Sequence, residues 1–367
     1  MLEEYPQIFL NVTKKNMKIK IIEIYRKKIP LKTPYLLAYK KIHYIDSIFT
    51  YVQTENGKSA WGESTPLLGY NKNSIEQIFN FTIDLAKQYI GKSAYDIVLE
   101  QPSKKDGFLY TAIFSPIEQL VREVKNFRIK IPLVGIIQEE SLGDIESCIA
   151  KIRQKGFKTF KMKVGYLSIE EDLQRIKIFQ EILLDDEVIR IDANQSLCLK
   201  NAEKIIHICN PKKIQFLEQP LNSDAWFEHG YLAKNSHIPI MLDESISDLD
   251  SIKKTAEFLS ASYIKLKLMK QGSFENLKKM SCLAKQLNLK VIIGNGVSTF
   301  ISNREEAIFW AEELAKFDLA GEMNGYLKMA PEYSFCSIKH TNFIDLNMPL
   351  DISNNIFKNT DRISFEA

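Results

Sequence analysis

Two pairs of lysines, each with one residue between its members, stand in short apolar runs of the chain. Lys161 and Lys163 lie in the run TFKMKVG, and Lys265 and Lys267 lie in YIKLKLMK. Because side chains alternate between the two faces of a β-strand, the members of each pair share one face. A lysine that has lost its proton can act as a general base, so each pair offers a base beside a cation. Solvated lysines at strand ends are the alternative for either pair taken alone.

Three acids end similar runs between the two lysine pairs. Asp192, Glu218 and Asp243 stand in VIRIDAN, IQFLEQP and IMLDES. If these runs are adjacent strands, the three carboxylates meet and repel one another unless a cation neutralises them. Carboxylates with no histidine or cysteine beside them suit Mg²⁺ or Mn²⁺ rather than zinc. The sequence therefore predicts one Mg²⁺ (or Mn²⁺) ion per subunit on these acids, whereas a single acid at a strand end is equally often a helix cap.

The first lysine pair predicts a weakened ammonium group. At a separation of about 6.6 Å and an effective dielectric constant of about 20, Lys161 and Lys163 repel by roughly 2.5 kcal/mol. This repulsion lowers the pKa of Lys163 toward that of a usable base, while Lys161 stays cationic and stabilises charge on a substrate oxygen. A lysine on each side of a carboxylate-bearing carbon, with a cation holding the resulting enediolate, predicts proton removal on one side and return on the other.

The spacing of these residues indicates the elements that position them. From Ile131 onward, eight short β-branched runs alternate with helix-length amphipathic stretches, and polar residues near successive strand ends lie 24 to 29 residues apart. Eight such units close into a barrel whose reactive groups lie at the carboxyl ends of its strands. We expect a loose leader or extension over 1–16, an α+β capping domain over 17–130, the barrel over 131–329, and a segment over 330–367 that returns to the capping domain.

The composition excludes several classes of protein. The 367 residues are 45% hydrophobic, and no basic tract interleaved with aromatic residues suggests a nucleic-acid partner. No apolar run is long enough for a membrane span. The five cysteines are scattered and form no CxxC pair, which favours a reducing compartment and a cytoplasmic location.

The motifs KMK, RIDANQ, FLEQP, LDES and IKLKLMKQG resemble those of the muconate-lactonising branch of the enolase superfamily, and WGESTP resembles its GWGE element. The resemblance implies a modified (β/α)₇β TIM-like barrel with an α+β capping domain. It also implies Mg²⁺ on the three acids, with Lys163 and Lys267 as the acid/base pair. Within the branch, KLKLMKQG and FDLAGEM are most similar to dipeptide epimerases.

The resemblance further implies a set of substrate-binding positions: Lys161, Lys265, Asn295, Val297, Asp318, Ala320 and Lys40. Dipeptide epimerases commonly carry a DxD pair on the last strand, where it holds the α-ammonium group of the dipeptide. Here Asp318 is present, Ala320 occupies the second position, and Glu322 is either a substitute or a solvated loop acid. Lys40, in a segment that resembles the mobile loop over the mouth, stands near the arginine of enzymes that act on Ala-Glu. Three tyrosines around it (Tyr35, Tyr39 and Tyr44) make hydrophobic or aromatic dipeptides an alternative to Ala-Glu.

These implications together predict a Mg²⁺-dependent dipeptide epimerase that inverts the α-carbon of the C-terminal residue by two-lysine 1,1-proton transfer. L-Ala-L-Glu and hydrophobic or aromatic dipeptides are the expected substrates. N-succinylamino acid racemases, o-succinylbenzoate synthases and muconate cycloisomerases share the two-lysine plan and are the alternatives. A metal-binding barrel without catalysis is the alternative of another class. Assembly into a homo-oligomer is left open by the sequence.

Overall fold

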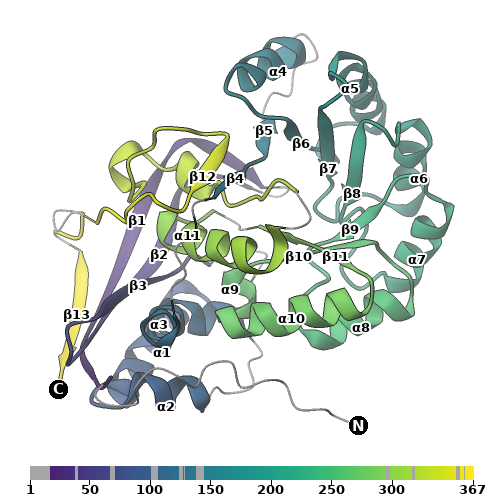
Figure 1. The fold of residues 1–367 in the computed structure, drawn as a ribbon. Coiled ribbons are helices and arrows are strands. Elements are labelled where there is room, and N and C mark those ends of the chain that lie inside the picture. The colour runs from purple at the N-terminus through teal and green to yellow at the C-terminus, as the bar shows by residue number, and fades with distance from the viewer. Residues whose placement is uncertain are drawn as a thin grey trace.

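An antiparallel sheet with helices on one side forms the first part of the molecule, which we call the capping unit (Figure 1). The computed structural model describes residues 17–37, 40–66, 71–100, 106–123, 127, 129–137, 144–294, 297–315, 319–352, 356–358 and 360–367. The strands of the capping unit are β1 (Ile19–Leu37), β2 (Lys40–Thr54), β3 (Ser59–Ser64) and β13 (Asp361–Glu366). Its helices are α1 (Ile75–Tyr89), α2 (Ala94–Leu99) and α3 (Gly107–Val121).

Local sequence explains where these helices begin. Ser74 caps α1 in a reciprocal capping box with Gln77, and Asp106 caps α3 by accepting a hydrogen bond from the backbone of Phe108. Apolar residues on the inner faces of the helices, such as Ile78 and Ile113, are buried against the sheet in a core of their own. The segment expected to cover the barrel mouth lies mostly in the β1–β2 hairpin, in which Leu37 pairs with Lys40.

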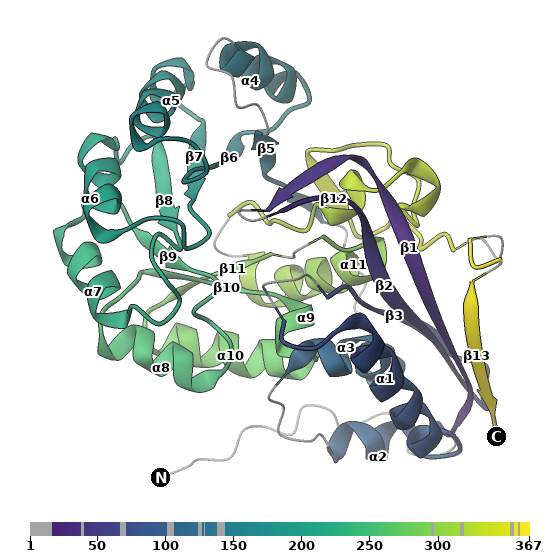
Figure 2. The same cartoon turned by 180° about the vertical axis from the view of Figure 1, so that it is seen from behind.

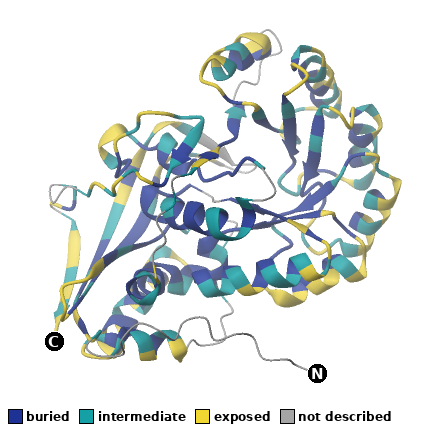
Figure 3. Cartoon of the chain, viewed as in Figure 1, coloured by how far each residue is buried: buried dark blue, intermediate teal, exposed yellow. Residues whose placement is uncertain are grey.

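A curled sheet of parallel strands forms the second part, and helices surround it on the outside (Figures 1 and 2). Its strands in spatial order are β5 (Gly135–Ile137), β6 (Thr159–Lys163), β7 (Val188–Asp192), β8 (Ile214–Glu218), β9 (Ile240–Leu242), β10 (Tyr263–Leu266) and β11 (Lys290–Ile293). The helices are α4 (Ile145–Gln154), α5 (Ile169–Ile182), α6 (Leu199–Ile208), α7 (Trp226–Asn235), α8 (Leu249–Glu257), α10 (Phe274–Gln286) and α11 (Phe300–Phe309). Figure 3 shows that these strands are mostly buried and that the exposed residues lie on the outer faces of the helices and in the loops.

Two residues close the curled sheet into a barrel. Gly321 bridges Leu133 before β5, and Glu322 bridges Gly294 after β11, both in the parallel sense. We call Gly321 and Glu322 the seam. The sequence predicts a full eighth strand in FDLAGEM, residues 317–323, but the described part of that run, 319–323, pairs with its neighbours only at this seam. One reason is that the carbonyl group of Ala320 accepts a hydrogen bond from the Arg190 side chain at 2.8 Å instead of joining a ladder.

The remaining elements connect the two parts. A two-stranded sheet pairs β4 (Lys130–Pro132) with β12 (Phe343–Asp345), and β13 pairs with β1 in the capping unit. Short helical segments are α9 (Leu268–Gln271), η2 (Trp310–Leu314), η4 (Gly325–Lys328) and η5 (Pro331–Tyr333). The exact domain boundaries at residues 17, 131 and 330 stay a prediction.

The capping unit packs against the turn that follows β10. Met269 of α9 is buried in the core of the capping unit, and the hydroxyl of Thr111 donates a hydrogen bond to its carbonyl at 3.3 Å. Gly107, the first residue of α3, lies so close to Lys270 and Gly272 that a Cβ atom would overlap their backbone. Lys267 is therefore followed at once by a helical turn that the capping unit holds in place.

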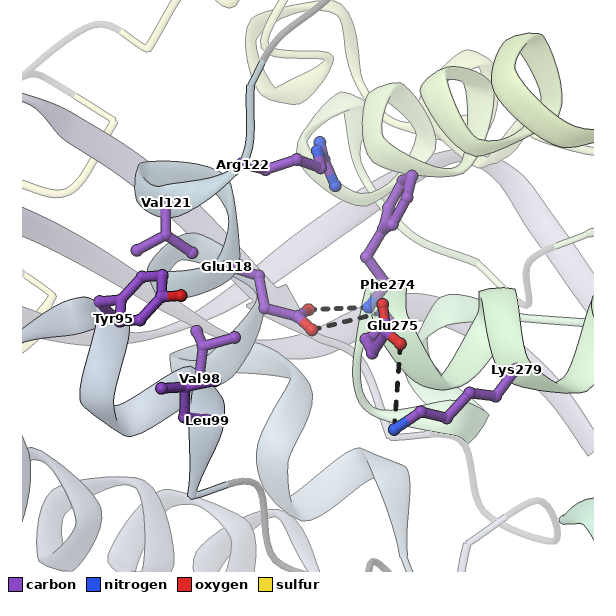
Figure 4. Close-up of a pocket in the computed structure, with 9 residues that line it drawn as sticks. All are labelled: Tyr95, Val98, Leu99, Glu118, Val121, Arg122, Phe274, Glu275 and Lys279. Atoms are coloured by element: carbon purple, nitrogen blue, oxygen red, sulfur yellow. Dashed lines mark hydrogen bonds and ion pairs between the residues drawn. The ribbon is translucent and has the colours of Figure 1, made fainter. Parts of the chain in front are cut away.

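Two buried carboxylates of the capping unit accept hydrogen bonds from the first turns of barrel helices. Glu118 accepts from the backbone of Phe274 at 2.7 Å and of Glu275 at 3.3 Å, at the start of α10 (Figure 4). Glu63 of the WGES run accepts from the backbone and hydroxyl of Thr299, at the start of α11. Because helix N-termini carry partial positive charge, these acids join the two parts electrostatically.

A cavity of about 320 Å³ lies beside the Glu118 contact. Figure 4 shows its lining, which comes from α2, α3 and the first two turns of α10. None of the predicted site residues lines this cavity. The candidate site therefore has to be located from the side chains at the strand ends of the barrel.

Candidate active site

The inner lysines of both pairs point into the barrel and are buried. Nζ of Lys161 lies 2.9 Å from Oδ2 of Asp192 and 2.7 Å from Oε2 of Glu218. Nζ of Lys265, only 1% exposed, contacts Oε1 of Glu218 and lies 4.0 Å from Oδ2 of Asp243. The alternative of solvated surface lysines is therefore wrong for these two residues. The expectation that the acids and lysines of different strands meet in one place is confirmed.

Lys267 is paired with the third acid. Its Nζ lies 2.7 Å from Oδ2 of Asp243. Burial opposes the charge of Lys267, but the Asp243 carboxylate outweighs burial and raises the pKa of Lys267 to about 12. Burial also opposes the charge of Asp243, yet the ammonium groups of Lys267 and Lys265 hold its pKa well below the ordinary value. In this environment Lys267 carries a proton that it can donate.

Lys163 ends β6 at the same level as Asp192, its register partner on β7. It is half-buried, whereas Lys161 is buried, and its carbonyl accepts a hydrogen bond from Arg175 at 3.1 Å. Burial opposes the charge of Lys161, but Asp192, Glu218 and Glu322 raise its pKa well above the ordinary value. Because these acids compensate the Lys161 charge, Lys161 repels Lys163 less than the sequence alone suggests.

The three acids suit a cation, although they do not chelate one as they lie. Among the residues that the structure describes, no group of three His, Cys, Asp or Glu side chains is arranged so that it could hold a metal ion. The ammonium group of Lys161 does, however, reach Asp192 and Glu218 together, which shows that one cation can join two of the acids. Oδ1 of Asp243 is buried and accepts no hydrogen bond from the described residues. By its chemistry, though not by its present arrangement, this set of carboxylate oxygens suits a hard cation such as Mg²⁺.

Strained backbone follows two of the acids, Asp192 and Glu218, within three residues. Asn194, Gln195 and Gln219 have positive φ angles, of 41°, 66° and 36°. Side-chain oxygen Oε1 of Gln219 accepts hydrogen bonds from the backbone of Asp243 at 2.9 Å and of Ser245 at 3.1 Å. Gln219 thereby ties the end of β8 to the end of β9 and orients Asp243. Strain of this kind is frequent at functional sites.

The cluster has one further member that the sequence did not single out, Arg190, and one whose role it left open, Glu322. Arg190 of β7 is fully buried, and its Nη1 lies 3.0 Å from Oε1 of Glu322. Glu322 is 6% exposed and is therefore not a solvated loop acid. The period of two along VIRID places Arg190 on the face of Asp192, so the signal that predicted the lysine pairs could have found it.

The predicted substrate-binding residues are only partly described. Val297 is buried in the hydrophobic core, and Ala320 is buried beside the seam. Lys40 is the first residue of β2, and its side chain, like Asn295 and Asp318, lies outside the described part of the structure. The roles of these residues stay predictions.

The sequence of this chain is similar to one protein family and to several characterised enzymes. Residues 144–304 match the family described as enolase C-terminal domain-like. A D-Ala-D/L-Ala epimerase of Cytophaga hutchinsonii is 26% identical over 74% of this chain and 78% of its own length. An N-succinyl-L-Arg/Lys racemase of Bacillus cereus is 24% identical over 86% of this chain and 89% of its own length.

The fold as a whole also has solved counterparts. A crystal structure of the dipeptide epimerase from Cytophaga hutchinsonii, complexed with Mg and the dipeptide D-Ala-L-Val, is similar with a TM-score of 0.83. That likeness covers 95% of this chain and 100% of the other, at 20% identity. It confirms the predicted modified barrel with an α+β capping unit.

Proposed function

Since the chain is an enzyme of the enolase superfamily, related to epimerases and racemases of that superfamily, we propose that it is a Mg²⁺-dependent dipeptide epimerase. Its reaction would invert the α-carbon of the C-terminal residue of the dipeptide. Lys163 and Lys267 would exchange the α-proton from opposite sides. The alternative of a metal-binding barrel without catalysis does not agree with membership among these enzymes.

The positions of β6 and β10 carry the proposal. Seven parallel strands and the seam form the ring, and within it β6 and β10 lie four places apart in either direction. Lys163 ends β6 and Lys267 follows β10, so the two lysines start from opposite walls of one barrel. A planar carbon held between them can lose a proton to one lysine and receive one from the other.

The remaining charges have distinct roles in this proposal. Asp192, Glu218 and Asp243 would hold Mg²⁺, which when bound supplies Lewis-acid polarisation of the substrate carboxylate. Lys161 and Lys265 would stabilise negative charge on the substrate oxygens from the barrel interior. Oδ2 of Asp243, 2.7 Å from Nζ of Lys267, stabilises the protonated lysine. A positive charge that neutralises Asp243 would therefore lower the pKa of Lys267 and turn it from a proton donor toward a base.

One observation favours a second substrate class. A free dipeptide amine needs an acid, but Ala320 replaces the second acid of the last strand and Glu322 already contacts Lys161, Lys265 and Arg190. An N-acylated amino acid has no ammonium group and does not need that acid. N-succinylamino acid racemisation is therefore the second candidate, and the Bacillus cereus relative is named for such a reaction.

Hydrogen exchange tests both candidates. The protein is incubated in D₂O with Mg²⁺ and with libraries of L,L-dipeptides and N-succinylamino acids, and mass spectrometry detects deuterium at the inverted carbon. We expect turnover within one library. Lys163→Ala should abolish exchange from one epimer of the substrate and Lys267→Ala exchange from the other. Absence of exchange with every member of both libraries would overturn the proposal.

A further inference from the structure

Glu322 is a shared partner of the two inner lysines. Its Oε2 lies 3.1 Å from Nζ of Lys161 and 2.8 Å from Nζ of Lys265. Its other oxygen, Oε1, lies 3.0 Å from Nη1 of Arg190. One buried carboxylate from the seam thus contacts three cations that come from β6, β7 and β10.

Arg190 holds Glu322 in a fixed place. The guanidinium donates from Nε to Oε1 of Gln215 at 2.6 Å and from Nη2 to the carbonyl of Ala320 at 2.8 Å. It also stacks on the ring of Phe216, 5.1 Å from the centroid. Each of its three nitrogens therefore has a partner, and the planar fork cannot turn without breaking several contacts. Glu322 is consequently a rigid anchor for the ammonium groups.

Glu218 competes with Glu322 for the same two ammonium groups. Lys161 contacts Oε2 of Glu218 at 2.7 Å, and Lys265 contacts Oε1. A divalent cation on Glu218 would have to displace both ammonium groups from these oxygens. Buried ammonium groups without a carboxylate are strongly disfavoured, so displacement is feasible only if another anion receives them. Among the described residues, Glu322 is the other acid that both lysines already contact.

We propose that Glu322 is a positioning residue that holds Lys161 and Lys265 and thereby leaves Glu218 available to the divalent cation. This inference rests on the proposed function, because it takes Asp192, Glu218 and Asp243 as the cation ligands. It assigns Glu322 to cation affinity rather than to the substrate amine.

Metal titration tests the inference without any substrate. Binding of Mn²⁺ is measured by electron paramagnetic resonance, and binding of Mg²⁺ by calorimetry, on the full chain. Glu322→Gln should weaken binding about 10- to 100-fold, the usual effect of removing a partner just outside the ligands. Glu322→Asp keeps the negative charge, so its metal affinity should lie between those of the wild type and Glu322→Gln. Glu187→Gln is the control: it removes a buried acid that lies outside the barrel and whose Oε1 is 2.7 Å from Nε of Arg153. It should leave the metal affinity unchanged.

A second substitution separates competition from a general loss of charge or of folding. Lys265→Met removes one competing ammonium group, so Glu322→Gln should cost several-fold less affinity in the Lys265→Met protein than in the wild type. An equal cost in both proteins would overturn the inference, as would unchanged affinity in Glu322→Gln. If the wild type itself binds neither Mn²⁺ nor Mg²⁺, the proposed function fails instead. If Glu322→Gln does not fold, Glu322→Asp takes its place in the test, because the shorter side chain moves the carboxylate away from the two lysines. Wild-type metal affinity in Glu322→Asp would then overturn the inference.

Discussion

Gly107→Ala should misplace Lys267 through the turn that follows it. An added Cβ would lie 2.5 Å from the backbone nitrogen of Gly272 and closer still to the carbonyl of Lys270. Backbone atoms cannot rotate away as a side chain can, so α3 and α9 have to separate. The separation needed is roughly 1 Å, and a displacement of that size can cost about 100-fold in rate. Alanine is a good helix former, so α3 itself is not weakened.

The loss of rate should affect proton removal from only one face of the substrate carbon. α9 begins directly after Lys267, whereas Lys163 ends β6 on the opposite wall. Deuterium exchange in D₂O, started separately from each epimer, should slow about 100-fold where Lys267 removes the proton and far less where Lys163 does. Urea unfolding should show a loss of about 1–3 kcal/mol in the free energy of unfolding, the usual cost of overpacking.

Gly230→Ala is the matched control. Its added Cβ would overlap the backbone carbonyl of Phe258, where α7 meets α8 on the outside of the barrel. We expect a similar loss of stability without a difference between the two epimers. Equal slowing of both epimers by Gly107→Ala, or no slowing of either, would refute the reasoning that the capping unit positions Lys267.

Two other predictions concern stability. His229 is buried, and burial lowers its pKa to about 4 from 6.5. The unfolded chain therefore takes up this proton first as the pH falls below 6.5, and between pH 7 and pH 5 the free energy of unfolding should drop by about 2 kcal/mol. His229→Gln should flatten that slope in urea titrations, and an identical slope would contradict the assignment. Glu63→Ala should lower the free energy of unfolding by about 3 kcal/mol, because Thr299 loses its buried acceptor. Glu63→Gln retains one acceptor oxygen and should lower it less. Equal losses in urea titrations would show that the hydrogen bonds to Thr299 are not the cause.

The strand pattern and the site acids could be predicted because both follow from local periodicity. A period of two puts Lys161 and Lys163 on one face, and regular spacing of the βα units brings Asp192, Glu218 and Asp243 to neighbouring strand ends. Neither inference needs knowledge of contacts between distant side chains. The fold class and the proximity of these charged side chains could therefore be predicted, and the structure confirms both.

The pairing of charges and the contacts of the capping unit could not be predicted in the same way. Whether Lys161 prefers Glu218, Glu322 or water depends on depth within the barrel, which no local pattern encodes. Glu322 is buried because Arg190 reaches across to it from β7. Met269 belongs to the core of the capping unit although its neighbours in sequence belong to the barrel. Such facts arise only from tertiary packing.

The pairing of β1 with β13 imposes an order on folding during synthesis. Residues 21–26 pair with residues 361–366, so the outer edge of β1 stays open while the ribosome makes the whole barrel. An unpaired strand edge is a template for association with other chains. Charged residues along β1, among them the exposed Lys20 and Lys28, protect that edge while it waits for its partner.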